Sequence, residues 1–254
     1  SAAVDTQLYA YFDNAAAADD ALSAFNSTYS GVWSFEDANP GTTVTDSSQS
    51  ANTGFGGGGM GAGNVVAGQV GNALDFNNAE YVAVENSYSG TGTVGSVSVS
   101  AWINTSYAGA GYNENWSIVD FDRSEFFNVF IDGATGQLSF STRAGSINDF
   151  SGGPAINDGV WHQVTAVYDG TDKILYVDGV EVARSVNPHG GSALGTANTR
   201  YGIIGDGSEA SSIDGSRNNM YYDGQIDELK VYDGTLSAAE IAQEYQNYNN
   251  VSSY

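Results

Sequence analysis

The sequence is short of several residue types, and each shortage narrows the possible classes of protein. It contains no cysteine, whereas a secreted protein of eukaryotic type would often carry disulfides; a protein exported from a bacterium into calcium-rich water can use a metal ion instead. Basic residues number only seven against 30 acidic ones, and the net charge of −23 excludes nucleic acid and anionic membranes as partners. No apolar run approaches the roughly 18 residues of a membrane-spanning helix. The chain begins without methionine or a basic leader, which predicts a segment of a longer protein whose export signal lies elsewhere.

The surplus of acidic residues has two explanations that can hold together. A solvated, salt-tolerant surface accounts for it, and the presence of only two lysines, Lys173 and Lys230, suits a saline habitat. Alternatively, some carboxylates are calcium ligands, because hard cations prefer oxygen donors.

Short β-strands dominate the sequence pattern. Residues 161–184 contain three runs of β-forming residues separated by the turns Asp169-Gly170 and Asp178-Gly179, which predicts an antiparallel meander. About a dozen such strands with turns every 8–12 residues indicate an all-β, two-sheet antiparallel jelly-roll sandwich. Ser237 and Glu240 form a capping-box pattern that predicts a short C-terminal helix through residue 245. Further strands are expected at 7–12, 31–35, 96–103, 117–121, 126–131, 137–142, 201–204 and 225–232, a hairpin at 73–76 and 81–84, a helix at 15–25, and loops at 36–64, 143–154 and 205–222.

An ordered set of motifs makes the chain resemble the laminin-G-like, concanavalin A-like family. The resemblance implies a curved antiparallel β-sandwich of a family whose members usually bind glycans or proteins rather than catalyse a reaction. It predicts a sandwich domain over residues 31–250, while residues 1–30 resemble the end of a small β-domain that precedes such modules in bacterial surface proteins. The motifs are Val32-Trp-Ser-Phe-Glu36, Asp46 with Asn52 and Gly54, Gly71-Asn-Ala-Leu-Asp-Phe76, Val97-Ser-Val-Ser-Ala-Trp102, Trp161-His162 through Tyr176-Val-Asp-Gly179, and Gly224-Gln-Ile-Asp-Glu-Leu-Lys-Val-Tyr232 followed by Leu236-Ser-Ala-Ala-Glu-Ile241.

The resemblance also implies a structural calcium ion between the loop after the first strand and the last strand. Its expected ligands are Glu36 (or Asp37), Asp46, Asn52 and Asp227. Asp227 lies in an otherwise apolar strand, and a buried carboxylate needs a cation or a full set of donors to offset its desolvation. The alternative is that Asp227 only caps backbone amides nearby.

A second group of residues is a candidate ligand-binding surface. Sugar recognition commonly combines a flat aromatic ring with fixed polar groups, and peptide recognition can use the same parts. The alternative is that the aromatic residues pack in the core or within loops. The candidate residues are Asp120, Asp122, Glu125, Asp206, Asp214, Tyr107, Tyr112, Trp116, Tyr221 and Tyr222, with Glu209, Asp223 and Phe150 nearby in the sequence.

Enzymatic activity is not expected. The related glycanases space their carboxylates as Glu-x-Asp-x-x-Glu on one strand, and that run does not occur in this sequence. The two histidines, His162 and His189, have no adjacent nucleophile motif. We therefore expect a calcium-dependent extracellular or cell-surface module of a larger bacterial adhesin or secreted protein, binding carbohydrate. The alternatives are a protein- or peptide-binding adhesion module and, more distantly, a polysaccharide-degrading enzyme or its accessory module.

Overall fold

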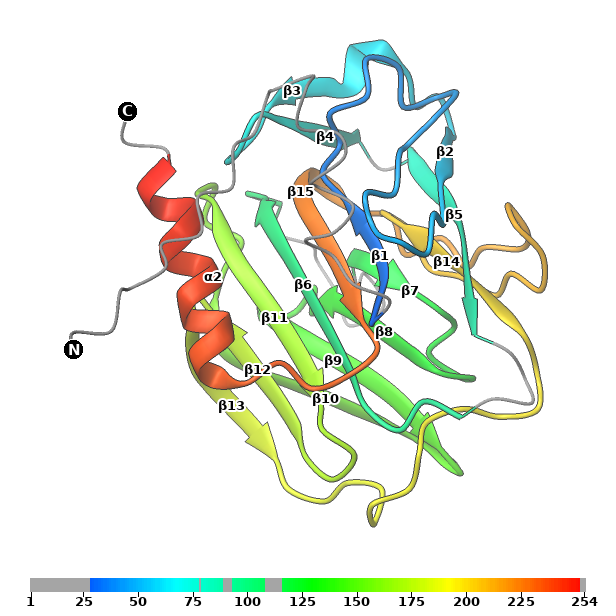
Figure 1. Cartoon of the computed structure of the whole chain (residues 1–254), viewed down its shortest axis with the longest axis vertical. Coiled ribbons are helices and arrows are strands. Elements are labelled where there is room, and N and C mark those ends of the chain that lie inside the picture. Colours follow the sequence, from blue (N-terminus) through cyan, green and yellow to red (C-terminus); the bar gives the residue numbers. More distant parts are fainter. Residues whose placement is uncertain (1–27, 78, 89–92, 108–115, 252–254) are drawn as a thin grey trace, which may run out of the picture.

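Two antiparallel β-sheets lie face to face and carry one α-helix on the outside (Figure 1). The structure is a computed structural model that describes residues 28–77, 79–88, 93–107 and 116–251. The expected two-sheet sandwich is confirmed. The predicted strand at 7–12 and helix at 15–25 lie outside the described residues, as does most of the 1–30 extension. Within the described part, no helix combines the length and the apolar character that crossing a membrane requires.

The larger sheet has eight strands, and its last strand changes partner along its length. Its strands are β1 (Tyr29–Trp33), β3 (Val65–Ala67), β4 (Asn72–Asn77), β6 (Val97–Asn104), β11 (His162–Tyr168), β12 (Lys173–Val177), β13 (Val180–Ser185) and β15 (Asp223–Tyr232). The order is β13-β12-β11-β6-β15-β4-β3, with β1 also paired to β15. Residues 223–226 of β15 pair with β4, and residues 229–232 pair with β1. A bulge with Glu228 at φ +50° lies between the two partners.

The smaller sheet has seven strands in the order β10-β9-β8-β7-β14-β5-β2. They are β2 (Gly54–Gly57), β5 (Tyr81–Tyr88), β7 (Trp116–Asp120), β8 (Phe127–Ile131), β9 (Gln137–Ala144), β10 (Ser146–Ala155) and β14 (Arg200–Ile204). A 3-10 helix, η1 (Ala62–Asn64), precedes β3. The long polar segment 205–222 joins β14 to β15, as predicted.

The predicted alternation of β11 separates two apolar layers. Val164, Ala166 and Tyr168 pack in the main core between the sheets. Val167 faces the other way and packs beneath the helix α2 (Ala238–Val251), where it contacts Ile241 in a second cluster. The eight-stranded sheet is therefore apolar on both faces, and α2 covers its outer face (Figure 1).

A buried polar network also fastens α2 to the sheet. Lys230 on β15 donates from Nζ to Glu244 Oε1 at 2.6 Å and to the hydroxyl of Tyr248 at 2.5 Å. The Tyr248 hydroxyl in turn donates to Glu228 Oε2 at 2.7 Å. The predicted capping box is confirmed, since Ser237 N donates to Glu240 Oε2 and Glu240 N to Ser237 Oγ. The helix continues to residue 251, beyond the expected end at 245, because these contacts hold its later turns.

Three local expectations are wrong. Residues 73–76 and 81–84 do not form a hairpin, because β4 and β5 belong to different sheets and the connection between them crosses the sandwich. The expected loop at 143–154 contains β10, a half-exposed edge strand that lacks an apolar face. The expected loop at 36–64 contains β2, whose glycines pair with β5 through their backbone.

Candidate functional site

The predicted calcium ligands occupy two places, and the first is already saturated with hydrogen bonds. Asp46 accepts from the backbone N–H of Val32, Ser48 and Asn52, at 2.7 to 2.8 Å, and from the Ser48 hydroxyl. The Asn52 side-chain amide donates to the carbonyl of Ser30. Asp46 and Asn52 therefore fix the loop after β1 with their own hydrogen bonds. Asp37 plays a similar part by accepting from Thr45.

The second place surrounds Asp227 at the β15 bulge. Asp227 is fully buried, its Oδ2 accepts from Val70 N at 2.9 Å, and its Oδ1 has no hydrogen-bond partner in the described part of the chain. Glu36 holds the same 68–72 loop by accepting from Asn72 N at 3.0 Å. Burial and the neighbouring charges of Glu228 and Glu36 raise the pKa of Asp227 to about 8.

The loop geometry leaves room for both carboxylates of this second place. A Cβ on Gly68 would lie 2.5 Å from Asp227 Oδ2, and one on Gly71, at φ +61°, would meet Glu36 Oε1 at 1.9 Å. The described residues contain no group of three or more Asp, Glu or His side chains that could share a metal ion. Glu36, Asp46 and Asp227 therefore do not form the single cluster expected. Of these three residues, Asp227 is the one with a buried oxygen that has no hydrogen-bond partner among the described residues, so it is the one that could accept a cation.

The acidic residues after β7 are engaged in different ways. Asp122 forms a 2.6 Å ion pair with Arg200, and Glu125 lies 3.7 Å from the same guanidinium while accepting from Asn198. Asp214 is exposed and accepts from the hydroxyl of Tyr81 at 2.7 Å. The remaining two, Asp120 and Asp206, are completely buried, so neither side chain reaches a ligand at the surface. For these two the expected role in direct ligand contact is corrected.

Part of the predicted aromatic surface is instead core. Trp116 is 3% exposed and Tyr222 is 0% exposed, with the Tyr222 ring edge-on to Phe76. Tyr107 is half-buried and packs edge-on against Trp116 at 4.9 Å between ring centroids. The chain beside Tyr221 meets the chain beside Trp116 in space, because Ser117 N donates to the carbonyl of Met220 at 3.0 Å. Among the candidate aromatic residues that the structure describes, Tyr107, Phe150 and Tyr221 are partly exposed, and Tyr112 lies outside the described residues.

The histidines serve the fold. His162 is held between Asp178, 2.8 Å from Nδ1, and Asp158, 3.3 Å from Nε2. Its hydrogen bond to Asp178 raises the pKa of the imidazole. His189 is buried and bonded to the hydroxyl of Thr142 at 2.7 Å, inside the sandwich.

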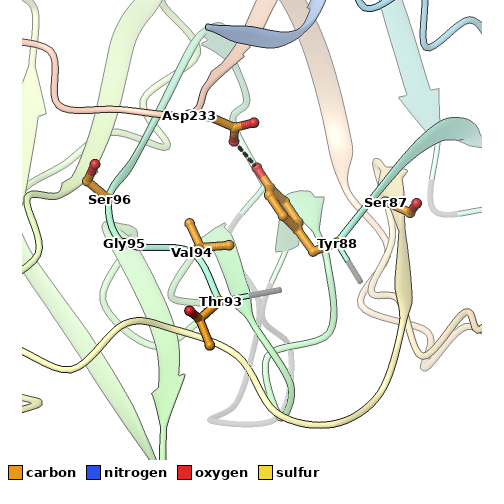
Figure 2. Close-up of a pocket in the computed structure, with 7 residues that line it drawn as sticks. All are labelled: Ser87, Tyr88, Thr93, Val94, Gly95, Ser96 and Asp233. Carbon is orange, nitrogen blue, oxygen red and sulfur yellow. Dashed lines mark hydrogen bonds between the residues drawn. The ribbon is translucent and has the colours of Figure 1, made fainter. Parts of the chain in front are cut away.

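A pocket of about 350 Å³ lies where the end of β5, the start of β6 and the turn after β15 meet (Figure 2). The Tyr88 ring packs edge-on against Phe121 and Phe127, and its hydroxyl points into the pocket, where it donates to Asp233 Oδ1 at 2.7 Å. In Figure 2 the Tyr88 hydroxyl lies against this carboxylate, while the side chains of Ser87, Thr93 and Ser96 lie elsewhere around the pocket. The residues lining the pocket are Ser87, Tyr88, Thr93, Val94, Gly95, Ser96 and Asp233.

Sequence reasoning missed this pocket. Asp233 belongs to one of the Asp-Gly pairs, which indicate a turn and nothing about its neighbours. Tyr88 and Asp233 are 145 residues apart, and only the sheet order brings them together.

Comparison with known proteins agrees with this architecture. Residues 76–242, more than half of the chain, match the model of the concanavalin A-like lectin/glucanases superfamily. The chain belongs to this superfamily. Among curated protein sequences, none matches it closely enough to be a relative.

Several solved structures share the fold of this superfamily member at low sequence identity. Domain 4 of AbnA, an extracellular arabinanase of glycoside hydrolase family 43 from Geobacillus stearothermophilus, was solved with arabinotriose; it is 17% identical with a TM-score of 0.60, over 85% of this chain and 97% of that one. The binding domain of Paraclostridial Mosquitocidal Protein 1 is 14% identical with a TM-score of 0.63, over 88% and 53%. The binding domain of botulinum neurotoxin DC, solved with rat synaptotagmin II, is 13% identical with a TM-score of 0.58, over 87% and 52%. This chain thus spans about half the length of the two toxin domains.

Proposed function

We propose that this domain is an extracellular carbohydrate-binding module that takes a neutral glycan in the pocket of Tyr88 and Asp233. The observation that carries the proposal is the lining of that pocket, which combines a carboxylate fixed by the Tyr88 hydroxyl with the hydroxyl-bearing residues Ser87, Thr93 and Ser96. Carboxylates and hydroxyls bind sugar hydroxyls well, and the volume of about 350 Å³ is within the range of small-molecule sites.

The charge of the domain favours a neutral ligand. A net charge of −23 repels acidic polysaccharides over long distances at low ionic strength. The relative solved with arabinotriose supports a glycan of this kind. The same relative is extracellular, which supports an extracellular location and a place within a larger secreted or surface protein.

The proposal includes a structural calcium ion held by Asp227, with Glu36 beside it. The unpartnered Oδ1 of Asp227 and the glycines that make room for the two carboxylates support this position. A calcium ion there would supply positive charge to a carboxylate that lacks it. The 68–72 loop, already bonded to both residues, would then be fixed against β15.

A glycan array paired with a peptide panel tests the function. We expect binding to neutral glycans and none to acidic ones. Asp233→Asn should weaken the best glycan about 10- to 100-fold, because a hydrogen bond to a charged group contributes roughly 1.5–3 kcal/mol. Asp149→Asn is the matched control, since Asp149 is an exposed carboxylate paired with Arg123.

Two results would contradict the proposal. Binding only to peptides would favour the adhesion alternative, for which the neurotoxin domain solved with synaptotagmin is the precedent. Equal glycan affinity of Asp233→Asn and the unmodified domain would place the glycan elsewhere.

A further inference from the structure

The segment 205–222 folds back onto the smaller sheet. Ser208 N donates to Asp120 Oδ2 on β7 at 2.9 Å, and Tyr201 N on β14 donates to the carbonyl of Ala210 at 2.9 Å. Within the segment, Ser208 pairs with Arg217 in an isolated bridge. The segment, gold to orange beyond β14 in Figure 1, is therefore attached to the sheet through a few specific contacts.

Two carboxylates lie at this attachment. Asp206 begins the folded-back part, and its Oδ1 accepts from Gly207 N at 2.6 Å. Because Asp120 is bonded to Ser208, two residues farther on, both carboxylates lie against the same short stretch of backbone. Asp120 and Asp206 are each 0% exposed. One oxygen of each, Oδ1 of Asp120 and Oδ2 of Asp206, is buried without a hydrogen bond of normal geometry among the described residues, although the backbone N–H groups of Asp122 and Met220 lie close enough to lower the pKa of Asp120 and Asp206, respectively.

The surrounding cations do not compensate this pair. Arg217 Nε lies 4.0 Å from Asp206 Oδ2, beyond hydrogen-bond distance, and its guanidinium stacks on the Tyr81 ring at 3.6 Å. Two further arginines near this end of β7 are engaged elsewhere, since Arg200 is paired with Asp122 and Arg123 with Asp149. Asp206 therefore has a long ion pair with Arg217, and a buried charge that is incompletely compensated costs several kcal/mol.

Burial affects the protonation of both groups. It raises the pKa of Asp206 to about 6 and that of Asp120 well above its ordinary value, with the charges of Asp122 and Asp206 adding to the effect on Asp120. An ion bound between the carboxylates would reverse these shifts, because a cation favours the ionised form.

We propose that Asp120 and Asp206 bind a calcium ion that joins strand β7 to the segment 205–222. Calcium takes six to eight oxygen ligands and accepts carbonyls and water among them. Because the described part of the chain offers no third Asp, Glu or His to this group, backbone carbonyls and water complete the coordination. The site is distinct from Asp227 and does not depend on the identity of the glycan.

Calcium titration by calorimetry tests the site on the whole domain. The unmodified domain and Asp227→Asn should each retain the equivalent held by Asp120 and Asp206, whereas Asp120→Asn and Asp206→Asn should each lose it or bind it at least about tenfold more weakly. Asp149→Asn, which removes a solvent-exposed carboxylate in the same sheet, should bind as the unmodified domain does.

Proteolysis of the unmodified domain provides a second measurement that needs no variant. Calcium should protect the segment 205–222 from cleavage several-fold relative to chelator, and Asp206→Asn should abolish that protection. Unchanged calcium stoichiometry in both variants, or equal cleavage of the segment with calcium and chelator, would overturn the proposal.

Discussion

Replacing Asp227 by asparagine should make the domain more stable in chelator at neutral pH. The carboxyl group is buried, one of its oxygens has no hydrogen-bond partner among the described residues, and burial raises its pKa to about 8, compared with roughly 3.9 in an unfolded chain. Between these values the folded state binds more protons than the unfolded state, so the free energy of unfolding falls as pH rises. At pH 7 the difference of about three pH units corresponds to roughly 4 kcal/mol, an upper limit because water entering the site would reduce it.

Urea unfolding in chelator at pH 4 and pH 7 measures this effect. Asp227→Asn should match the unmodified domain at pH 4 and exceed its free energy of unfolding at pH 7. Calcium should then raise the stability of the unmodified domain by mass action and raise that of the variant less. If the variant is no more stable than the unmodified domain in chelator at pH 7, the reasoning about the unpartnered oxygen is refuted.

The other predictions concern the helix and the histidine. Lys230→Met should lower the free energy of unfolding by about 3–5 kcal/mol, because it leaves the buried Glu228 and the partly buried Glu244 without their cation. Hydrogen exchange should show α2 opening first, and a rigid helix in the variant would contradict the role of the network. His162→Gln should lower stability below pH 6.5 and have little effect well above it. The raised pKa of His162 means that the charged imidazole stabilises the fold at low pH and that this contribution is lost as pH rises through the folded-state pKa. Denaturation midpoints of the unmodified domain and of His162→Gln at pH 5.5 and 8.5 test this pH dependence. An equal difference between the two proteins at both pH values would refute it.

Much of the fold could be predicted because its turns are local. Asp178 and Gly179 both have positive φ, as the two-residue turn between β12 and β13 requires, so that meander follows from the sequence. The partners of β4 and β5 could not be predicted, since alternation identifies a strand but not the sheet that it joins. β10 was missed because Gly152, Gly153 and Pro154 are typical of a loop, while an edge strand tolerates them.

The candidate site was harder to predict because its contacts join segments that are far apart in the sequence. A carboxylate that accepts backbone amides, such as Asp46, looks the same in sequence as one that binds a cation, such as the one proposed at Asp227. Only the hydrogen-bond partners distinguish them, and these come from segments far away in the chain. Val70, for example, is 157 residues from Asp227.

Chemical-shift mapping with the best glycan from the array tests the central proposal most directly. We expect the largest perturbations at Ser87, Tyr88, Ser96 and Asp233, with the backbone signals of Tyr107 and Tyr221 unchanged. Perturbations centred on Tyr107 and Tyr221, with the pocket unaffected, would contradict it.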